Sequence, residues 1–123
     1  MDGGIMDHIL VIDNRYDIRN FLHEALAPIG YEVKGAHDSE EGIELLNNGY
    51  NFNLVITDIN MPRINANAVA KHIKSSNKAN IPIVAIIDSG NDSNNRELFN
   101  IVLVKPFKLK TLVKVIRLLI SHR

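Results

Sequence analysis

The chain of 123 residues is long enough for one domain with one hydrophobic core. Its 14 basic and 14 acidic residues balance, so no net field favours a nucleic acid or an anionic membrane as a partner. The absence of cysteine excludes disulfides, thiol catalysis and cysteine metal sites, and is compatible with the cytoplasm, where we expect the protein to act. The sequence has no apolar run long enough to span a bilayer, and its five histidines show no metal-ligand spacing.

The N-terminal residues 1–7, MDGGIMD, have neither the basic region nor the apolar core of a signal peptide. We expect them to form a disordered leader or a remnant of cloning, with Met6 as an alternative natural start. Residues 8–123 are then expected to form a single domain.

Short apolar runs bounded by turn residues follow one another along the rest of the chain. Such runs are typical of strands buried on both faces of a sheet. The second run is more polar, as expected of an edge strand. The predicted strands are His8–Ile12, Glu32–Ala36, Asn53–Thr57, Ile83–Ile87 and Ile101–Val104.

Helical periodicity marks the segments between these strands. Pro28 and Gly30 end the first helix. Asp38 with Glu41 forms a capping-box pattern at the start of the second helix, which Asn47-Asn48-Gly49 ends. The first helix is predicted at about Arg15–Ala27, and the third, fourth and fifth at about Asn65–Ser75, Asn94–Phe99 and Leu109–Ser121. The fourth helix is expected to be short or mobile. The expected inner faces are Ile18, Phe21, Leu22, Ala25 and Leu26, then Ile43 and Leu46, then Ala66, Val69, Ala70 and Ile73, and finally Leu109, Leu112, Val113, Ile116, Leu119 and Ile120.

Alternating strands and helices predict an α/β fold built from right-handed βαβ units. The sheet would be parallel and doubly wound, with helices on both faces. A chain this short fits five strands in the order 2-1-3-4-5, with a cleft between the first and third strands.

Residues that could carry chemistry follow three of the predicted strands. Asp13 and Asn14 follow the first strand, Asp58 the third and Lys105 the fifth. Because the carboxyl ends of parallel strands meet at one edge of the sheet, we expect these side chains to converge. Carboxylate and amide oxygens suit Mg²⁺, and a lysine suits a phosphoryl group.

The residues and their order resemble the receiver domain of bacterial response regulators, the phosphoacceptor half of two-component signalling. The resemblance covers about His8 to Ser121 and rests on the segments ILVIDN, LVITDINMP, IPIVAII and VKPF. It implies a flavodoxin-like receiver fold with a cis Lys105-Pro106 bond. It further implies a site in which Asp58 accepts the phosphoryl group, Lys105 contacts the phosphoryl oxygens, and Mg²⁺ is held by Asp13, Asp58, Asn60 and Asn14. The partner would be a histidine kinase or a phosphotransfer protein, and the chain would be a phosphoacceptor, not an enzyme beyond self-phosphorylation and dephosphorylation.

Several positions depart from the family pattern. The family usually has a second acid in place of Asn14, so Mg²⁺ binding should be weak. Ile87 replaces the hydroxyl residue that usually ends the fourth strand, although Ser89 would substitute for it if the strand ended later. Val102 stands where the family often has an aromatic switch side chain, and Asn65-Ala66 replaces the usual Asp-Gly.

Two functions therefore stay open. The chain is either a receiver that takes a phosphoryl group at Asp58, or a pseudo-receiver that acts as a phosphorylation-independent protein-protein interaction module. An unrelated flavodoxin-like binding protein fits less well, because no Gly-rich phosphate loop follows the first strand. The sequence leaves open whether the chain acts alone or belongs to a longer protein.

The last helix also carries Val115 and Leu118, which lie away from its predicted core face and are flanked by basic residues. They are either scattered exposed apolar residues or, together with the fifth strand, a surface for a partner or a homodimer.

Overall fold

The computed structural model describes residues 6–60, 62–90 and 96–120. The strands are β1 (Asp7–Ile12), β2 (Tyr31–Ala36), β3 (Leu54–Asp58), β4 (Ile83–Ile87) and β5 (Ile101–Val104). The α-helices are α1 (Tyr16–Leu26), α2 (Ser39–Asn47), α3 (Ala66–Lys74) and α4 (Leu109–Ile120). Short 3₁₀ turns span Ala27–Ile29 and Arg96–Leu98.

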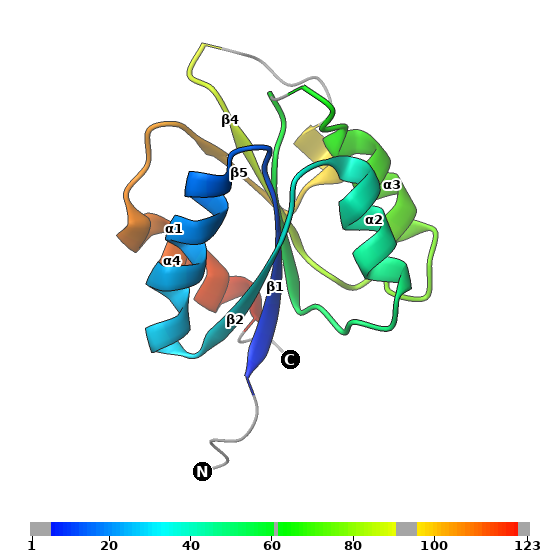
Figure 1. The fold of residues 1–123 in the computed structure, drawn as a ribbon. Coiled ribbons are helices and arrows are strands. Elements are labelled where there is room, and N and C mark those ends of the chain that lie inside the picture. The colour runs from blue at the N-terminus through cyan, green and yellow to red at the C-terminus, as the bar shows by residue number, and fades with distance from the viewer. Residues whose placement is uncertain (1–5, 61, 91–95, 121–123) are drawn as a thin grey trace.

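The five strands form one parallel sheet in the order β2-β1-β3-β4-β5. Helices α1 and α4 cover one face of the sheet, and α2 and α3 cover the other (Figure 1). This confirms the predicted α/β, doubly wound five-stranded fold with the strand order 2-1-3-4-5. Within the described ranges, no helix is long and apolar enough to cross a membrane.

The core has two layers because successive strand residues point to opposite faces. On β1, Ile9 and Val11 pack with α1 and α4, whereas Leu10 and Ile12 pack with α2 and α3. Strands β3 and β4 are buried at every position. The continuous apolar runs of the sequence are therefore the strands covered on both faces.

The element boundaries agree closely with the sequence prediction. Strands β4 and β5 have the predicted bounds, while β1 and β2 start one residue earlier and β3 is displaced by one residue, so that it ends at Asp58. After α1, a 3₁₀ turn leads to Gly30, which has a left-handed conformation with φ of 100°. Of the predicted helix Asn94–Phe99, the described residues 96–99 contain the 3₁₀ turn Arg96–Leu98, and residues 94 and 95 lie outside the described residues.

The prediction that Phe21 and Leu109 belong to the core is wrong. Phe21 is 54% exposed, because α1 buries a narrow stripe through Leu22 and Leu26, and Phe21 lies roughly 100° around the helix from Leu22. Leu109 is exposed because it is the first residue of α4, one turn before Leu112, the first fully buried residue of that helix.

Helix α2 approaches β1 closely at Gly42, which is buried. A Cβ atom added there would lie 2.5 Å from Cδ1 of Ile12, which is itself fully buried. A glycine at this helix position therefore permits close packing of α2 on the sheet.

We expect Gly42→Ala to lower the free energy of unfolding by about 1–3 kcal/mol through overpacking, although alanine alone favours a helix by about 1 kcal/mol. Urea unfolding measures the change. Adding Ile12→Val removes the clashing Cδ1, so the double variant should be more stable than the sum of the two single changes predicts. Strict additivity would show that Ile12 is not the obstacle.

Candidate functional site

The carboxyl ends of the strands meet at the upper edge of the sheet in Figure 1, where the predicted site residues come together. Asp58, the last residue of β3, is 2% exposed, and its Oδ2 lies 2.7 Å from Lys105 Nζ. The backbone N–H of Lys105 donates to the Ile87 carbonyl oxygen at 2.8 Å, which fixes the residue after β5 beside β4. The Lys105-Pro106 bond that follows is cis, as predicted.

Asp13 is held at this edge by three different contacts. Its backbone N–H donates to the Ala36 carbonyl oxygen at 3.0 Å, and its carboxylate Oδ1 accepts from the Arg15 backbone N–H at 2.9 Å. Its own carbonyl oxygen accepts from the Arg19 guanidinium at 2.8 Å. Arg19 lies across Gly35 of β2, where an added Cβ would come within 2.9 Å of the Arg19 Cδ. The side chain of Arg19 thus sets the position of the loop after β1.

Asn60 connects the loops that follow β3 and β4. Its backbone N–H donates to Asp58 Oδ1 at 2.8 Å, and its side-chain oxygen accepts from the Asp88 backbone N–H at 2.7 Å. Both oxygens of Asp58 are thereby directed: Oδ1 faces the Asn60 backbone N–H and Oδ2 faces Lys105.

The loop between β3 and α3 is braced against α2. Arg63 has a positive φ of 66°, which is uncommon for a side-chain-bearing residue, and its carbonyl oxygen accepts from the Ser39 backbone N–H at 3.3 Å. The Ser39 hydroxyl accepts from the Asn65 backbone N–H. Asn65 then caps α3 by accepting from the Ala68 backbone N–H at 3.0 Å. In this chain, Asn65-Ala66 begins the helix without the usual Asp-Gly.

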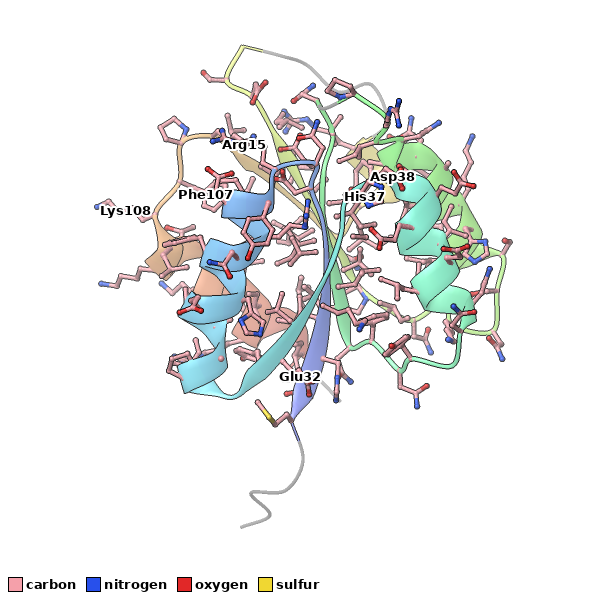
Figure 2. All side chains as sticks on the ribbon, in the orientation of Figure 1. Arg15, Glu32, His37, Asp38, Phe107 and Lys108 are labelled. Carbon is pink, nitrogen blue, oxygen red and sulfur yellow. The ribbon has the colours of Figure 1, made fainter. Side chains whose placement is uncertain are left out.

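The charges at this edge are coupled. Burial raises the pKa of the Asp13 carboxyl, against the Arg15 backbone hydrogen bond, and the nearby charge of Asp58 raises it further. Burial lowers the pKa of Lys105, but the hydrogen bond and charge of Asp58, with Asp88 and Asp13, outweigh burial and raise it. Figure 2 shows Arg15 at the same edge, whereas Glu32 lies at the opposite end of the sheet. The Arg15 guanidinium is paired with Asp17, at 2.8 Å.

The oxygen atoms at this edge fit a magnesium ion. Asp13 and Asp58 supply two carboxylates, and the Lys105 ammonium contacts Asp58 Oδ2 at 2.7 Å. The described residues include no group of three or more acidic, histidine or cysteine side chains that could hold a metal. Mg²⁺ does not need such a group, because it is usually bound through one or two carboxylates and keeps several waters. Asn14 is exposed beside Asp13.

The positions that depart from the family pattern lie where they were predicted. Ile87 is the last residue of β4 and is 1% exposed, so no hydroxyl stands there. Ser89 is exposed in the turn beyond it, and the later strand end that would bring Ser89 into the site is not found. Val102 is half-buried on β5.

The predicted partner surface on α4 is smaller than expected. Val115 is half-buried and packs against the core layer of α1 and α4, so it is not well away from the core. Leu118 is exposed and lines an open groove with Ile29, Lys114 and Arg117. The homodimer through this face stays a prediction.

Sequence reasoning missed two residues of this site. Asp88 follows β4 directly, and its Oδ1 lies 3.6 Å from Lys105 Nζ. The signal that identified Asp58, a carboxylate at a strand end, was present for Asp88 as well. The contact of Arg19 with Asp13 had no such signal, because it depends on the reach of a long side chain over a glycine.

Comparison with known proteins defines the class. The sequence model of the response regulator receiver domain matches residues 9–117, and the chain belongs to this family. Receiver domains are signalling modules of two-component systems that interact with histidine kinases or phosphotransfer proteins and generally bind Mg²⁺ at their phosphorylation site.

Two curated relatives of the chain are named as transcriptional regulators. The chain is 34% identical over 115 residues to the probable transcriptional regulator ycf27 of Porphyridium aerugineum, covering 90% of this chain and 47% of that protein. It is 40% identical over 76 residues to the uncharacterized transcriptional regulatory protein YrkP of Bacillus subtilis, covering 62% of this chain and 31% of YrkP. The chain therefore spans less than half the length of these relatives.

Solved structures share the whole fold. The response regulator TrrA of Thermotoga maritima, in complex with Mg²⁺ and BeF, has a TM-score of 0.81 at 33% identity, covering 93% of this chain and 99% of that one. A response regulator receiver domain protein from Clostridium thermocellum has a TM-score of 0.84 at 26% identity, covering 95% of this chain and 96% of that one.

The raised pKa of Asp13 gives a prediction about stability. The folded state holds this proton more tightly than the unfolded chain, so stability is lost as the pH rises from the ordinary value of an Asp carboxyl through the folded pKa. In metal-free buffer, Asp13→Asn should therefore be more stable than the wild type at about pH 7, by a margin that shrinks towards about pH 4. Urea unfolding at both pH values measures this.

Asp17→Asn is the control of opposite sign. The hydrogen bond from Arg15 lowers the pKa of the exposed Asp17, so this variant should lose rather than gain stability at neutral pH. An Asp13→Asn protein that is less stable than the wild type at neutral pH would contradict the account of the Asp13 environment.

Proposed function

We propose that this chain is a receiver module in two-component phosphorelay signal transduction that accepts a phosphoryl group at Asp58 with the help of Mg²⁺. The observation that carries the proposal is the 2.7 Å ion pair between Lys105 Nζ and Oδ2 of the buried Asp58, at the carboxyl edge of the sheet beside Asp13. A buried carboxylate with a lysine next to it has both a nucleophile and a cation for a phosphoryl group. The donor would be a histidine kinase or a phosphotransfer protein in the cytoplasm.

The reaction is an in-line phosphoryl transfer. A carboxylate oxygen of Asp58 attacks the phosphorus of a phosphohistidine, forming a P–O bond while the P–N bond of the donor breaks and its electron pair returns to the imidazole. Lys105 offers its ammonium to the oxygens on which negative charge is concentrated. The backbone N–H of Asn60 holds the carboxylate in its orientation. The protein thus works mainly by positioning and electrostatics.

Bound Mg²⁺ supplies positive charge that stabilises the transferring group. Asp13, Asp58, the Asn60 carbonyl and the Asn14 amide oxygen are the atoms of this chain that would hold it. Because Asn14 is neutral where the family usually has a second acid, the ion is expected to bind weakly.

The alternative is a pseudo-receiver that binds partners without phosphorylation. The observation in its favour is the buried Ile87, which has no hydroxyl to offer a phosphoryl oxygen. The two proposals differ in one measurable property, which is whether the site takes up a phosphoryl group or its mimic in the presence of Mg²⁺.

Beryllofluoride, which mimics an aspartyl phosphate, tests the proposal. In ¹H–¹⁵N spectra recorded at millimolar Mg²⁺, we expect the wild type to show shifts around Asp13, Asp58 and Lys105, and Asp58→Asn to show none. Glu24→Gln, which removes an exposed acid from α1, should behave as the wild type. A wild type without shifts would reject the phosphoacceptor and leave the interaction module.

The missing hydroxyl leads to a gain-of-function prediction. Ile87→Thr should bind beryllofluoride about tenfold or more tightly, because a hydrogen bond to a charged group contributes about 1.5–3 kcal/mol. Ile87→Val is the matched control, since valine has the shape of threonine without the hydroxyl. Equal affinities of the Thr and Val variants in the same titration would show that position 87 does not reach the bound group.

A further inference from the structure

Lys105 has two carboxylate neighbours. Its Nζ lies 2.7 Å from Asp58 Oδ2 and 3.6 Å from Asp88 Oδ1. Asp58 is buried, whereas the Asp88 side chain is 55% exposed. The ammonium that the proposed reaction needs is therefore shared between the acceptor carboxylate and a second one on the rim of the site.

The backbone fixes Asp88 in this place. Its N–H donates to the Asn60 side-chain oxygen at 2.7 Å, and the Asn60 N–H donates to Asp58 Oδ1. On the other side, Ile87 is the residue of β4 that pairs with Val104, and its carbonyl oxygen accepts from the Lys105 N–H. Asp88 is thus connected through single residues to both Asp58 and Lys105, and its carboxylate faces the same ammonium.

We propose that Asp88 opposes phosphorylation of Asp58 by competing for Lys105. This inference rests on the proposed function. It adds that Asp88 lowers the affinity of the site for a phosphoryl group. In the free protein, Lys105 balances two carboxylates. A phosphoryl group on Asp58 brings up to two negative charges and needs the same ammonium. The Asp88 carboxylate then repels the phosphoryl oxygens, and it also competes with them for the Lys105 ammonium.

The charge of Asp88 should be visible in an affinity. At saturating Mg²⁺, Asp88→Asn should bind beryllofluoride roughly threefold to tenfold more tightly than the wild type, the scale of one partly solvated like-charge contact. The difference should decrease at high salt, because the carboxylate is exposed. Asp88→Glu keeps the charge and should retain an affinity near that of the wild type.

Two controls separate this effect from others. Glu24→Gln changes the net charge by the same amount on α1 and should leave the affinity unchanged. A titration with Mg²⁺ alone shows whether Asp88 is instead a metal ligand, in which case Asp88→Asn would lose Mg²⁺ affinity strongly and the inference would be overturned.

The outcomes also distinguish this inference from the proposed function. If the wild type and Asp88→Asn bind beryllofluoride equally, the role of Asp88 is rejected while Asp58 remains the acceptor. Weaker binding by Asp88→Asn rejects it as well, because Asp88 would then support the bound group. If neither protein binds, the proposed function and the role of Asp88 fail together.

Discussion

The ion pair between Lys105 and Asp58 is what allows a carboxylate to sit at the end of the central strand. Asp58 is almost completely buried, and a buried charge is costly unless it is paired. Its partner comes from beyond β5, two strands away in the sheet. Lys105 reaches it because its backbone is bonded to Ile87, at the end of the intervening strand. The pair therefore forms only when β3, β4 and β5 are assembled in register, so the geometry of the site depends on the correct pairing of these three strands.

The loops at this edge are held by hydrogen bonds in which at least one partner is a backbone group. Asp13 is fixed through its N–H, its carbonyl and its carboxylate, and Asn60 joins the loops after β3 and β4. Arg19 supplies one of these contacts from α1. The two apolar core layers on either face of the sheet provide stability, and the edge held by hydrogen bonds can keep charged and polar groups that a core would not contain.

The sequence predicted the fold well because its strongest signals are local. Strands β4 and β5 are continuous apolar runs whose ends are marked by polar residues, and α3 has a regular apolar stripe. What it predicted less well depends on neighbours. Phe21 has the right spacing for the core but lies at the edge of the stripe that α1 buries. The contact of Arg19 with Asp13 depends on the reach of a long side chain, which spacing along the chain does not encode. Asp88, by contrast, follows β4 directly and could have been found by the same reasoning that identified Asp58.

The distribution of charge gives the site its particular character. The family usually has two acids after the first strand, and this chain has Asp13 and the neutral Asn14 there. It has a carboxylate after β4 instead, so two acids, Asp58 and Asp88, share the ammonium of Lys105. The charge of Asp13 acts on Lys105 from farther away. Compared with the usual pattern, a negative charge is absent at Asn14, where a metal ion would be held. A negative charge is present instead at Asp88, next to Lys105. In the proposed function, this arrangement would weaken the contribution of both cations to binding a phosphoryl group, because one acid fewer would hold Mg²⁺ and Lys105 already contacts Asp88.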